Sequence, residues 1–213
     1  MGDSPAGPRT LVLGGARSGK SAHAEELVGA AGPVRYLATA VPDPADRDFA
    51  ARIAGHRARR PAHWEVLEGA DLAAVLAGHP GDPHPALAGQ LGDPAPARTG
   101  DPGAPAQARN LADPVPATLV DDIGTWLTAR IDALDAWESP RGTVAPDTHA
   151  LVAAVTEYRH RLVLVSPEVG FGVIPATRSG RLFRDEIGAL NQRLARVCDE
   201  VVLVVAGIPM RVK

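Results

Sequence analysis

The stretch that decides the fold runs from residue 10 to residue 21 and reads TLVLGGARSGKS. Its part from Gly14 to Ser21 satisfies the phosphate-loop pattern Gly-x-x-x-x-Gly-Lys-Ser/Thr. Residues 10–13 predict a buried strand before the loop, and the residues from Lys20 onward predict a helix after it. Glycines let backbone N–H groups converge on phosphates at the positive end of such a helix. The stretch predicts a nucleoside triphosphate site, where Lys20 reaches the β- and γ-phosphates and the Ser21 hydroxyl binds Mg²⁺.

Apolar runs and helical segments alternate outward from this stretch. The apolar runs are short and mostly rich in Val and Leu, like strands buried on both faces, and lie at 10–13, 34–38, 64–67, 118–120, 162–165 and 201–205. Helices are expected at 20–30, 44–59, 124–136, 147–158 and 178–197. The last has one apolar stripe of Phe183, Ile187, Leu190, Leu194 and Val197. The alternation predicts an α/β fold with three layers α/β/α around a mostly parallel sheet. From this alternation together with the phosphate loop, we expect the phosphate-loop NTPase (RecA-like) class.

The overall composition excludes several classes of protein. The 213 residues suffice for one domain, and 22 basic against 25 acidic side chains give a net charge of −3. This balance argues against a polybasic nucleic-acid binder or a membrane-surface protein, and no apolar run approaches the roughly 20 residues that span a bilayer. The lone Cys198 excludes an intrachain disulfide framework and a Cys-based zinc site. The first residues lack the features of a signal peptide, so we expect a cytoplasmic protein.

A proline-rich stretch at 78–116 interrupts the alternation. Its 39 residues include 9 Pro, 6 Gly and 8 Ala, and nothing in them repeats at the period of a helix or strand. Such a segment buries too little apolar surface to offset the entropy lost on ordering. We therefore expect a single domain over 1–213 that carries a disordered surface insertion at 78–116. A tolerated loop expansion is favoured over an interaction role.

Two acidic residues follow the apolar run 118–120. A phosphate loop needs a carboxylate on the Mg²⁺ side at the end of a neighbouring strand, and Asp121 is the first carboxylate there. Asp122 is predicted to cap the helix that starts near Gly124. The chain contains neither the Asn-Lys-x-Asp motif of switch GTPases nor the Leu-Ser-Gly-Gly signature of transporter ATPases. The motifs alone therefore indicate a phosphate-loop kinase or NTPase.

Wider blocks of sequence resemble one known family. Besides the phosphate loop, the resemblance rests on blocks at 23–25, 36–40, 51–56, 60–64, 168–175, 183–185, 191–195 and 199–208. Over residues 10–76 and 117–213 the chain resembles the bifunctional adenosylcobinamide kinase/adenosylcobinamide-phosphate guanylyltransferase family of cobalamin biosynthesis. The resemblance implies that ATP or GTP phosphorylates the aminopropanol hydroxyl of adenosylcobinamide. GTP then donates GMP to that phosphate through a guanylyl-histidine enzyme, which yields adenosylcobinamide-GDP and pyrophosphate.

The resemblance also assigns residues to the site. The nucleotide contacts of the family fall on Gly14, Gly15, Ala16, Arg17, Ser18, Gly19, Lys20, Ser21, Thr39, Ala40, Val41, Arg60, Pro61, Ala62, Glu68 and Asp121. Members are expected to be cytoplasmic homo-oligomers, with trimers the anticipated form. Two features depart from the family pattern: the 78–116 stretch is long, and Pro167 precedes Glu168 where an Asn is expected.

His56 is the predicted guanylyl acceptor. It lies on the helix expected at 44–59, with Arg52 and Arg60 four residues to either side. The pattern by itself favours a half-buried packing histidine, and the family resemblance reverses that preference. His56 and Lys20 are therefore the predicted catalytic residues. Two alternatives stay open: a single-activity kinase of another small alcohol, and a non-catalytic nucleotide-binding regulator.

Overall fold

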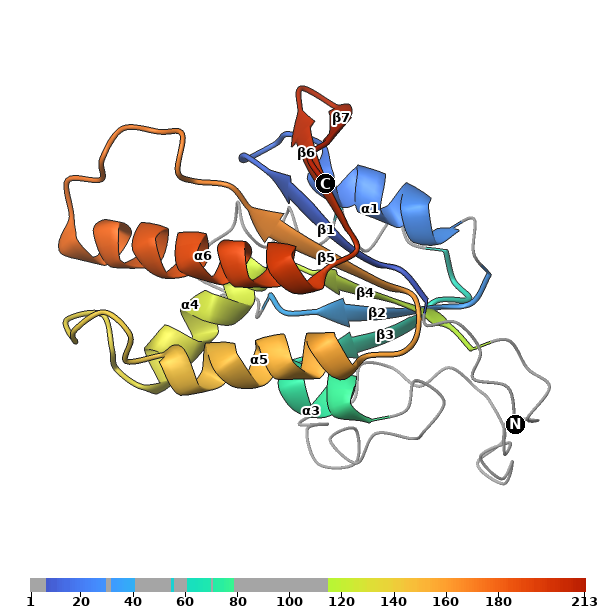
Figure 1. Cartoon of the computed structure of the whole chain (residues 1–213), viewed down its shortest axis with the longest axis horizontal. Coiled ribbons are helices and arrows are strands. Elements are labelled where there is room, and N and C mark those ends of the chain that lie inside the picture. Colours follow the sequence, from blue (N-terminus) through green and yellow to red (C-terminus); the bar gives the residue numbers. More distant parts are fainter. Residues whose placement is uncertain (1–6, 30–31, 41–54, 56–60, 70, 79–114) are drawn as a thin grey trace.

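The computed structural model describes residues 7–29, 32–40, 55, 61–69, 71–78 and 115–213. These residues form a seven-stranded sheet with strand order β3-β2-β4-β5-β1-β6-β7 (Figure 1). The strands are β1 (Arg9–Gly14), β2 (Val34–Ala38), β3 (Glu65–Glu68), β4 (Ala117–Asp121), β5 (Leu162–Pro167), β6 (Glu200–Val205) and β7 (Ile208–Arg211). Strands β1 to β6 pair in parallel, and β7 pairs antiparallel with β6. The predicted mostly parallel sheet is confirmed.

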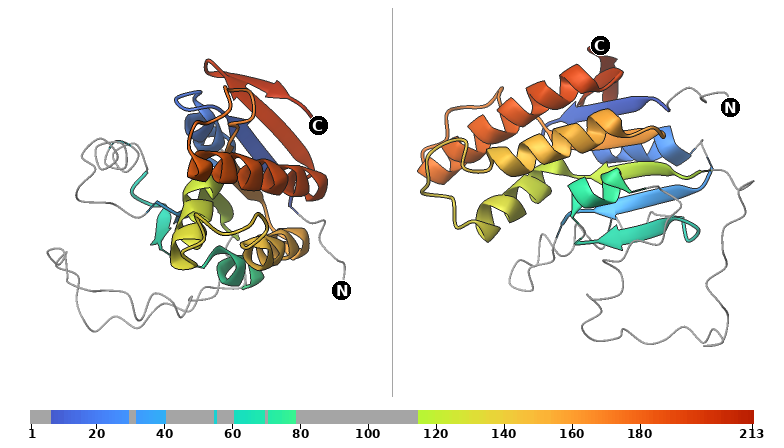
Figure 2. Two further views of the ribbon diagram at one scale, coloured as in Figure 1. Left: turned by 90° about the vertical axis from the view of Figure 1, so that its left-hand side faces the viewer. Right: turned by 60° about the horizontal axis from the view of Figure 1, so that its bottom comes forward.

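Helices cover both faces of the sheet (Figure 2). One face packs against α1 (Lys20–Gly29). The other packs against α3 (Leu72–Ala77), α4 (Ile123–Ala133), α5 (Ala145–Glu157) and α6 (Arg178–Val197). This is the three-layer α/β/α arrangement of a phosphate-loop NTPase.

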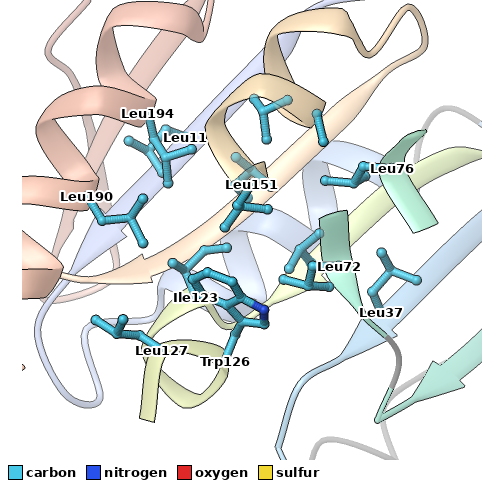
Figure 3. Packing of buried hydrophobic residues seen from close by; sticks show 14 of the residues in the cluster. Leu11, Leu37, Leu72, Leu76, Ile123, Trp126, Leu127, Leu151, Leu190 and Leu194 are labelled. Carbon is cyan, nitrogen blue, oxygen red and sulfur yellow. The ribbon is translucent and has the colours of Figure 1, made fainter. Parts of the chain in front are cut away.

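Each central strand contributes side chains to two cores. In β5, Leu162 and Leu164 join the core under α3 to α6, while Val163 and Val165 join the core under α1, and all four are fully buried. Burial on both faces explains the continuous apolar runs. Figure 3 shows the larger core, where the helices bring in Leu72, Leu76, Ile123, Trp126, Leu127, Leu151, Leu190 and Leu194.

The helix predicted at 178–197 coincides with α6. Ile187, Leu190 and Leu194 of its stripe are fully buried, and the two ends of the stripe are partly buried against the same core. The helix begins where the Thr177 hydroxyl accepts a hydrogen bond from the Gly180 N–H at 3.1 Å. A long stripe and a strong cap therefore agree, which is why the prediction was accurate here.

Other elements differ from the predictions at their ends or were not predicted. The helix expected at 124–136 ends at Ala133, and Asp135 turns the chain with a positive φ of 47°. The six-residue α3 and the four-residue β7 were not predicted. Helix α3 is too short for its periodicity to be recognised, and all four residues of β7 are exposed, so that strand lacks a buried pattern.

Two predictions fall mainly on residues outside the described part of the chain. The helix expected at 44–59 is one, with only Gly55 described there, as helical. Residues 79–114 of the expected insertion are the other. At the two borders of that stretch, the Gly78 N–H donates to the Ala74 carbonyl at 3.2 Å, and Pro116 is buried. Within the described ranges, no helix has the length and apolar character needed to cross a membrane.

Candidate active site

The carboxyl ends of the parallel strands bring the predicted site residues together. The register pairs Ala38 at the end of β2 with both Glu68 of β3 and Asp121 of β4. Strand β5 separates β4 from β1, so Gly14 and the phosphate loop reach the same edge. Thr39 follows directly after β2. Ligands of open α/β sheets bind outside this edge.

The phosphate loop folds back on itself between β1 and α1. The Ser18 N–H donates to the Gly15 carbonyl at 3.3 Å, and the Lys20 N–H donates to the Ser18 hydroxyl at 3.3 Å. Gly19 has a left-handed φ of 93°. A Cβ at Gly14 would lie 2.8 Å from the Val204 carbonyl oxygen, so this position requires glycine. The loop has the curled backbone that the motif predicts.

The turn between β6 and β7 supports the phosphate loop from one side. The Gly207 N–H donates to the Ser18 carbonyl at 2.8 Å. Ala206 and Gly207 form the turn with φ values of 51° and 80°. A Cβ at Gly19 would lie 3.2 Å from the Gly207 Cα, so the two backbones are close. Sequence reasoning missed this support, because Ala-Gly is not among the dipeptides that mark a two-residue hairpin and β7 is exposed.

Hydroxyl groups hold the Asp121 carboxylate on the opposite side of the loop. The Ser21 hydroxyl donates to Asp121 Oδ1 at 3.1 Å, and the Tyr36 hydroxyl donates to Oδ2 at 2.6 Å. The two predicted metal ligands, 100 residues apart in sequence, therefore meet. Tyr36 was not predicted as part of the site, because no motif marks a buried tyrosine within a strand.

This pair of oxygen ligands fits Mg²⁺. Mg²⁺ binds hard oxygen ligands and usually keeps only one or two protein ligands beside phosphate and water oxygens. The Ser21 hydroxyl and the Asp121 carboxylate are such ligands, and they lie beside the phosphate loop. Elsewhere in the described part of the chain, no three or more His, Cys, Asp or Glu side chains cluster as a metal site.

The neighbouring Asp122 has a structural role. Its carboxylate accepts a hydrogen bond from the Thr125 N–H at 2.8 Å and caps α4, which confirms the prediction. Its N–H donates to the Thr39 Oγ1 at 2.9 Å, and that hydroxyl donates to the Asp122 carbonyl at 2.6 Å. Burial raises the pKa of the Asp122 carboxyl, with Asp121 adding to the effect, whereas the hydrogen bonds from Thr125 and the charge of Lys20 lower it. The Thr39 hydroxyl, a predicted nucleotide contact, thus ties β2 to the start of α4.

Ala40 follows Thr39 after β2 and is half-buried. The other predicted contacts lie around β3 or outside the described residues. Pro61 and Ala62 are exposed before β3, and Glu68 is exposed at its end. Trp64 stacks on Tyr36 with ring centroids 6.1 Å apart, which links this region to Asp121. Val41, Arg60 and the predicted nucleophile His56 lie outside the described residues, so their placement in the site remains a prediction.

The segment after β5 adds a contact that sequence reasoning did not assign. The Glu168 N–H donates to the Gly14 carbonyl at 3.0 Å, where the phosphate loop begins. Asn191 of α6 holds the end of β5: it accepts a hydrogen bond from the Ser166 hydroxyl at 2.6 Å and donates one to the Pro167 carbonyl at 3.0 Å. Glu168 is therefore fixed between the phosphate loop and α6.

Comparison of the sequence with known proteins identifies the family of this chain. The family described as cobinamide kinase / cobinamide phosphate guanyltransferase matches residues 10–92 and 104–212. The chain belongs to this family. It is 35% identical over 212 residues to the bifunctional adenosylcobalamin biosynthesis protein CobU of Salmonella typhimurium, covering 95% of this chain and 98% of that protein. It is 37% identical over 207 residues to the protein CobP of Pseudomonas aeruginosa, which has the same description, covering 96% and 97%.

Membership in the cobinamide kinase/guanyltransferase family confirms the resemblance seen in the sequence. The chain is an enzyme with two activities, a cobinamide kinase and a cobinamide phosphate guanyltransferase. Nucleotides are substrates of both reactions, which agrees with the phosphate loop at the carboxyl edge of the sheet.

Proposed function

We propose that the carboxyl edge of the sheet serves both reactions at one nucleotide site. The first phosphorylates adenosylcobinamide, and the second transfers GMP from GTP to adenosylcobinamide phosphate. The hydrogen bond of 3.1 Å between Ser21 and Asp121 carries the proposal. It joins the two protein ligands of a phosphate-loop metal site directly beside Lys20. The descriptions of the two bifunctional relatives support the pairing of activities.

In the kinase step, the phosphate loop and Lys20 hold the β- and γ-phosphates of ATP or GTP in line with the acceptor hydroxyl. The acceptor oxygen forms a bond to the γ-phosphorus as the bond from that phosphorus to the bridging oxygen breaks. The nucleoside diphosphate leaves, and the hydroxyl proton is released to water. Ser21 and Asp121 would hold Mg²⁺, which neutralises charge on the phosphate oxygens. The Tyr36 hydroxyl orients the Asp121 carboxylate for this task.

In the guanylyl step, we assign the nucleophile to His56 on the strength of the family resemblance. A neutral imidazole nitrogen is nucleophilic near pH 7 and needs no separate base. It attacks the α-phosphorus of GTP, forms a phosphorus–nitrogen bond and releases pyrophosphate. The phosphate of adenosylcobinamide phosphate then attacks the same phosphorus and frees the imidazole. A homotrimer and a cytoplasmic location are proposed from the family alone.

The test uses GTP labelled at the α-phosphate, followed by denaturing gel electrophoresis, with corrinoid phosphorylation measured separately. The native protein should take up a label that is lost in acid and retained in alkali. His56→Ala should lose the label and guanylyl transfer while keeping kinase activity. The control is His63→Ala, at an exposed histidine close to His56 in sequence, which should keep the label and both activities. Lys20→Ala should lower kinase turnover by about 10²-fold or more.

Three other results would contradict the proposal. A label retained in His56→Ala would move the acceptor to His23 or His63. Phosphorylation of cobinamide without any label on the native protein would indicate a single-activity kinase. Stoichiometric nucleotide binding without turnover in the presence of cobinamide would indicate a regulator.

A further inference from the structure

A cavity of about 490 Å³ lies between α6 and the segment that follows β5. Its lining residues are Gly170, Arg184, Asp185, Gly188, Ala189, Gln192 and Arg193. The cavity is near the phosphate loop, because the Glu168 N–H bonds to the Gly14 carbonyl and Gly170 follows only two residues later. None of these lining residues belongs to the nucleotide site described above.

Arg184 lines the cavity and carries a hydrogen-bond donor without a partner in the described part of the chain. Its Nη2 donates to the Gly170 carbonyl at 2.8 Å, while its Nη1 is buried and finds no partner among the described residues. A buried donor without a partner is costly, so a shift of this side chain that brings Nη1 to a ligand oxygen in the cavity would be favourable. The Asp185 carboxylate is already used by Arg141, whose Nε lies 2.5 Å from Oδ2. The exposed Gln192 amide adds both a donor and an acceptor.

The segment 168–177 borders the cavity with exposed apolar side chains. Phe171, Val173 and Ile174 are 84%, 94% and 72% exposed. In Figure 1 this segment runs beyond the end of β5 and returns to the start of α6. Single exposed apolar side chains are common on protein surfaces, but three large ones within four residues form a patch typical of a binding site.

Hydrogen bonds fix this segment at both ends. Arg184 bonds to the Gly170 carbonyl, and Arg181 donates to the carbonyls of Pro175 and Ala176 at 2.9 and 2.7 Å. The apolar side chains between these anchors are therefore presented on a held backbone. A cavity with a few polar groups beside a preformed apolar surface is the usual form of a small-molecule site.

The chemistry of the proposed kinase step identifies the occupant. Transfer in line requires the acceptor hydroxyl to lie next to the γ-phosphate, so the rest of the acceptor must lie close to the phosphate loop. Cobinamide joins a broad macrocycle with apolar faces to peripheral carboxamide arms. We propose that segment 168–177 and the cavity on α6 form the corrinoid subsite, with apolar side chains against the macrocycle and Arg184 and Gln192 bonded to carboxamides. The inference rests on the proposed function, which supplies the acceptor.

The experiment measures corrinoid affinity by equilibrium dialysis of the full-length protein, followed by the absorbance of cobinamide. Val173→Ser and Arg184→Gln are the test variants. The matched controls are Val212→Ser and Arg196→Gln. Val212 is another exposed valine, and Arg196 is exposed in the last turn of α6. Each test variant should raise the dissociation constant for cobinamide about tenfold, while the dissociation constant for GTP stays within about twofold. Both controls should behave like the native protein.

The outcomes separate the subsite from its rivals. Unchanged cobinamide affinity in both test variants overturns the subsite. If light scattering then shows that Val173→Ser lowers the oligomeric mass, the segment is instead an interface between copies of this chain. Should Arg184→Gln lose GTP affinity through misfolding, Val173→Ser decides, because its exposed side chain has no packing role. A native protein that binds no cobinamide contradicts the proposed function as well as the subsite, whereas native binding that survives both substitutions contradicts the subsite alone.

Discussion

The two edges of the sheet carry aspartates that are held in different ways. At the amino edge, Asp199 accepts three hydrogen bonds from Arg9, from the backbone N–H at 2.8 Å, from Nε at 3.2 Å and from Nη2 at 3.1 Å. At the carboxyl edge, Asp121 accepts hydrogen bonds from the hydroxyls of Ser21 and Tyr36. A carboxylate bonded in this way to a guanidinium has its charge neutralised by the protein itself. Hydroxyl groups orient a carboxylate but carry no charge of their own that would neutralise it.

The different partners of Asp199 and Asp121 indicate that the two edges of the sheet have different roles. The side-chain and backbone hydrogen bonds from Arg9 hold the pKa of Asp199 below its usual value, which links the starts of β1 and β6. Burial raises the pKa of the adjacent Cys198 thiol to about 12, so that cysteine is a neutral packing group. The amino edge therefore stabilises the fold, and the carboxyl edge is left to bind substrate.

The largest expected effect comes from removing each aspartate in turn. Asp121→Asn should lower kinase turnover by about 10²-fold or more, because the proposed Mg²⁺ site would lose its carboxylate. Asp199→Asn should lower the melting temperature and leave turnover unchanged. Steady-state kinetics with adenosylcobinamide and thermal unfolding measure the two effects. Near-normal turnover in Asp121→Asn would contradict the role given to the carboxyl edge.

A second comparison uses two glycines with similar left-handed backbone conformations. Gly207 and Gly142 have φ values of 80° and 86°, and a Cβ at either meets nothing within 4 Å. Substitution by alanine should therefore cost each about 1–2 kcal/mol of stability. Only Gly207 supports the phosphate loop, so Gly207→Ala should weaken GTP binding about threefold to tenfold while Gly142→Ala does not. Isothermal titration checks this, and equal GTP affinities would mean that the β6–β7 turn does not position the loop.

A third comparison removes one hydroxyl at each edge. Tyr36→Phe deletes the hydrogen bond to Asp121 and keeps the ring against Trp64, so turnover should fall about threefold to tenfold with a higher Mg²⁺ requirement. Tyr158→Phe deletes the 2.7 Å hydrogen bond to the Thr118 Oγ1 near the amino edge and should leave turnover unchanged. Mg²⁺ titrations of the two variants make the comparison. Equal kinetics would show that the Tyr36 hydroxyl does not orient Asp121.

The smallest effect concerns pH. The pKa of Asp199 is lowered in the folded protein, so its contribution to the free energy of unfolding is present above the ordinary value of 3.8 and is lost as pH falls through the folded value. The stability difference between the native protein and Asp199→Asn should therefore shrink as pH is lowered below about 4. Urea unfolding from pH 7 to pH 3 measures it. A difference that grows toward acid pH would contradict the assigned direction.

Local pattern and motif determined much of this protein. The phosphate loop has a characteristic glycine spacing, and α6 has an apolar stripe long enough to identify a helix. Both could therefore be predicted from the sequence alone. The meeting of Ser21 and Asp121 was also predictable, because the carboxyl ends of parallel strands share one edge. The family was identified because its blocks are long and collinear, and the comparisons confirm it.

Tertiary structure alone decided the contacts that complete the site. The Tyr36 hydroxyl on Asp121, the Gly207 N–H on Ser18 and the Glu168 N–H on Gly14 each join elements distant in sequence or separated by another strand. The partner of such a group depends on which strands become neighbours in the sheet, which periodicity does not specify. The exposed strand β7 and the short helix α3 were missed for a related reason: burial produces the pattern by which elements are recognised, and β7 is exposed while α3 is too short to display it.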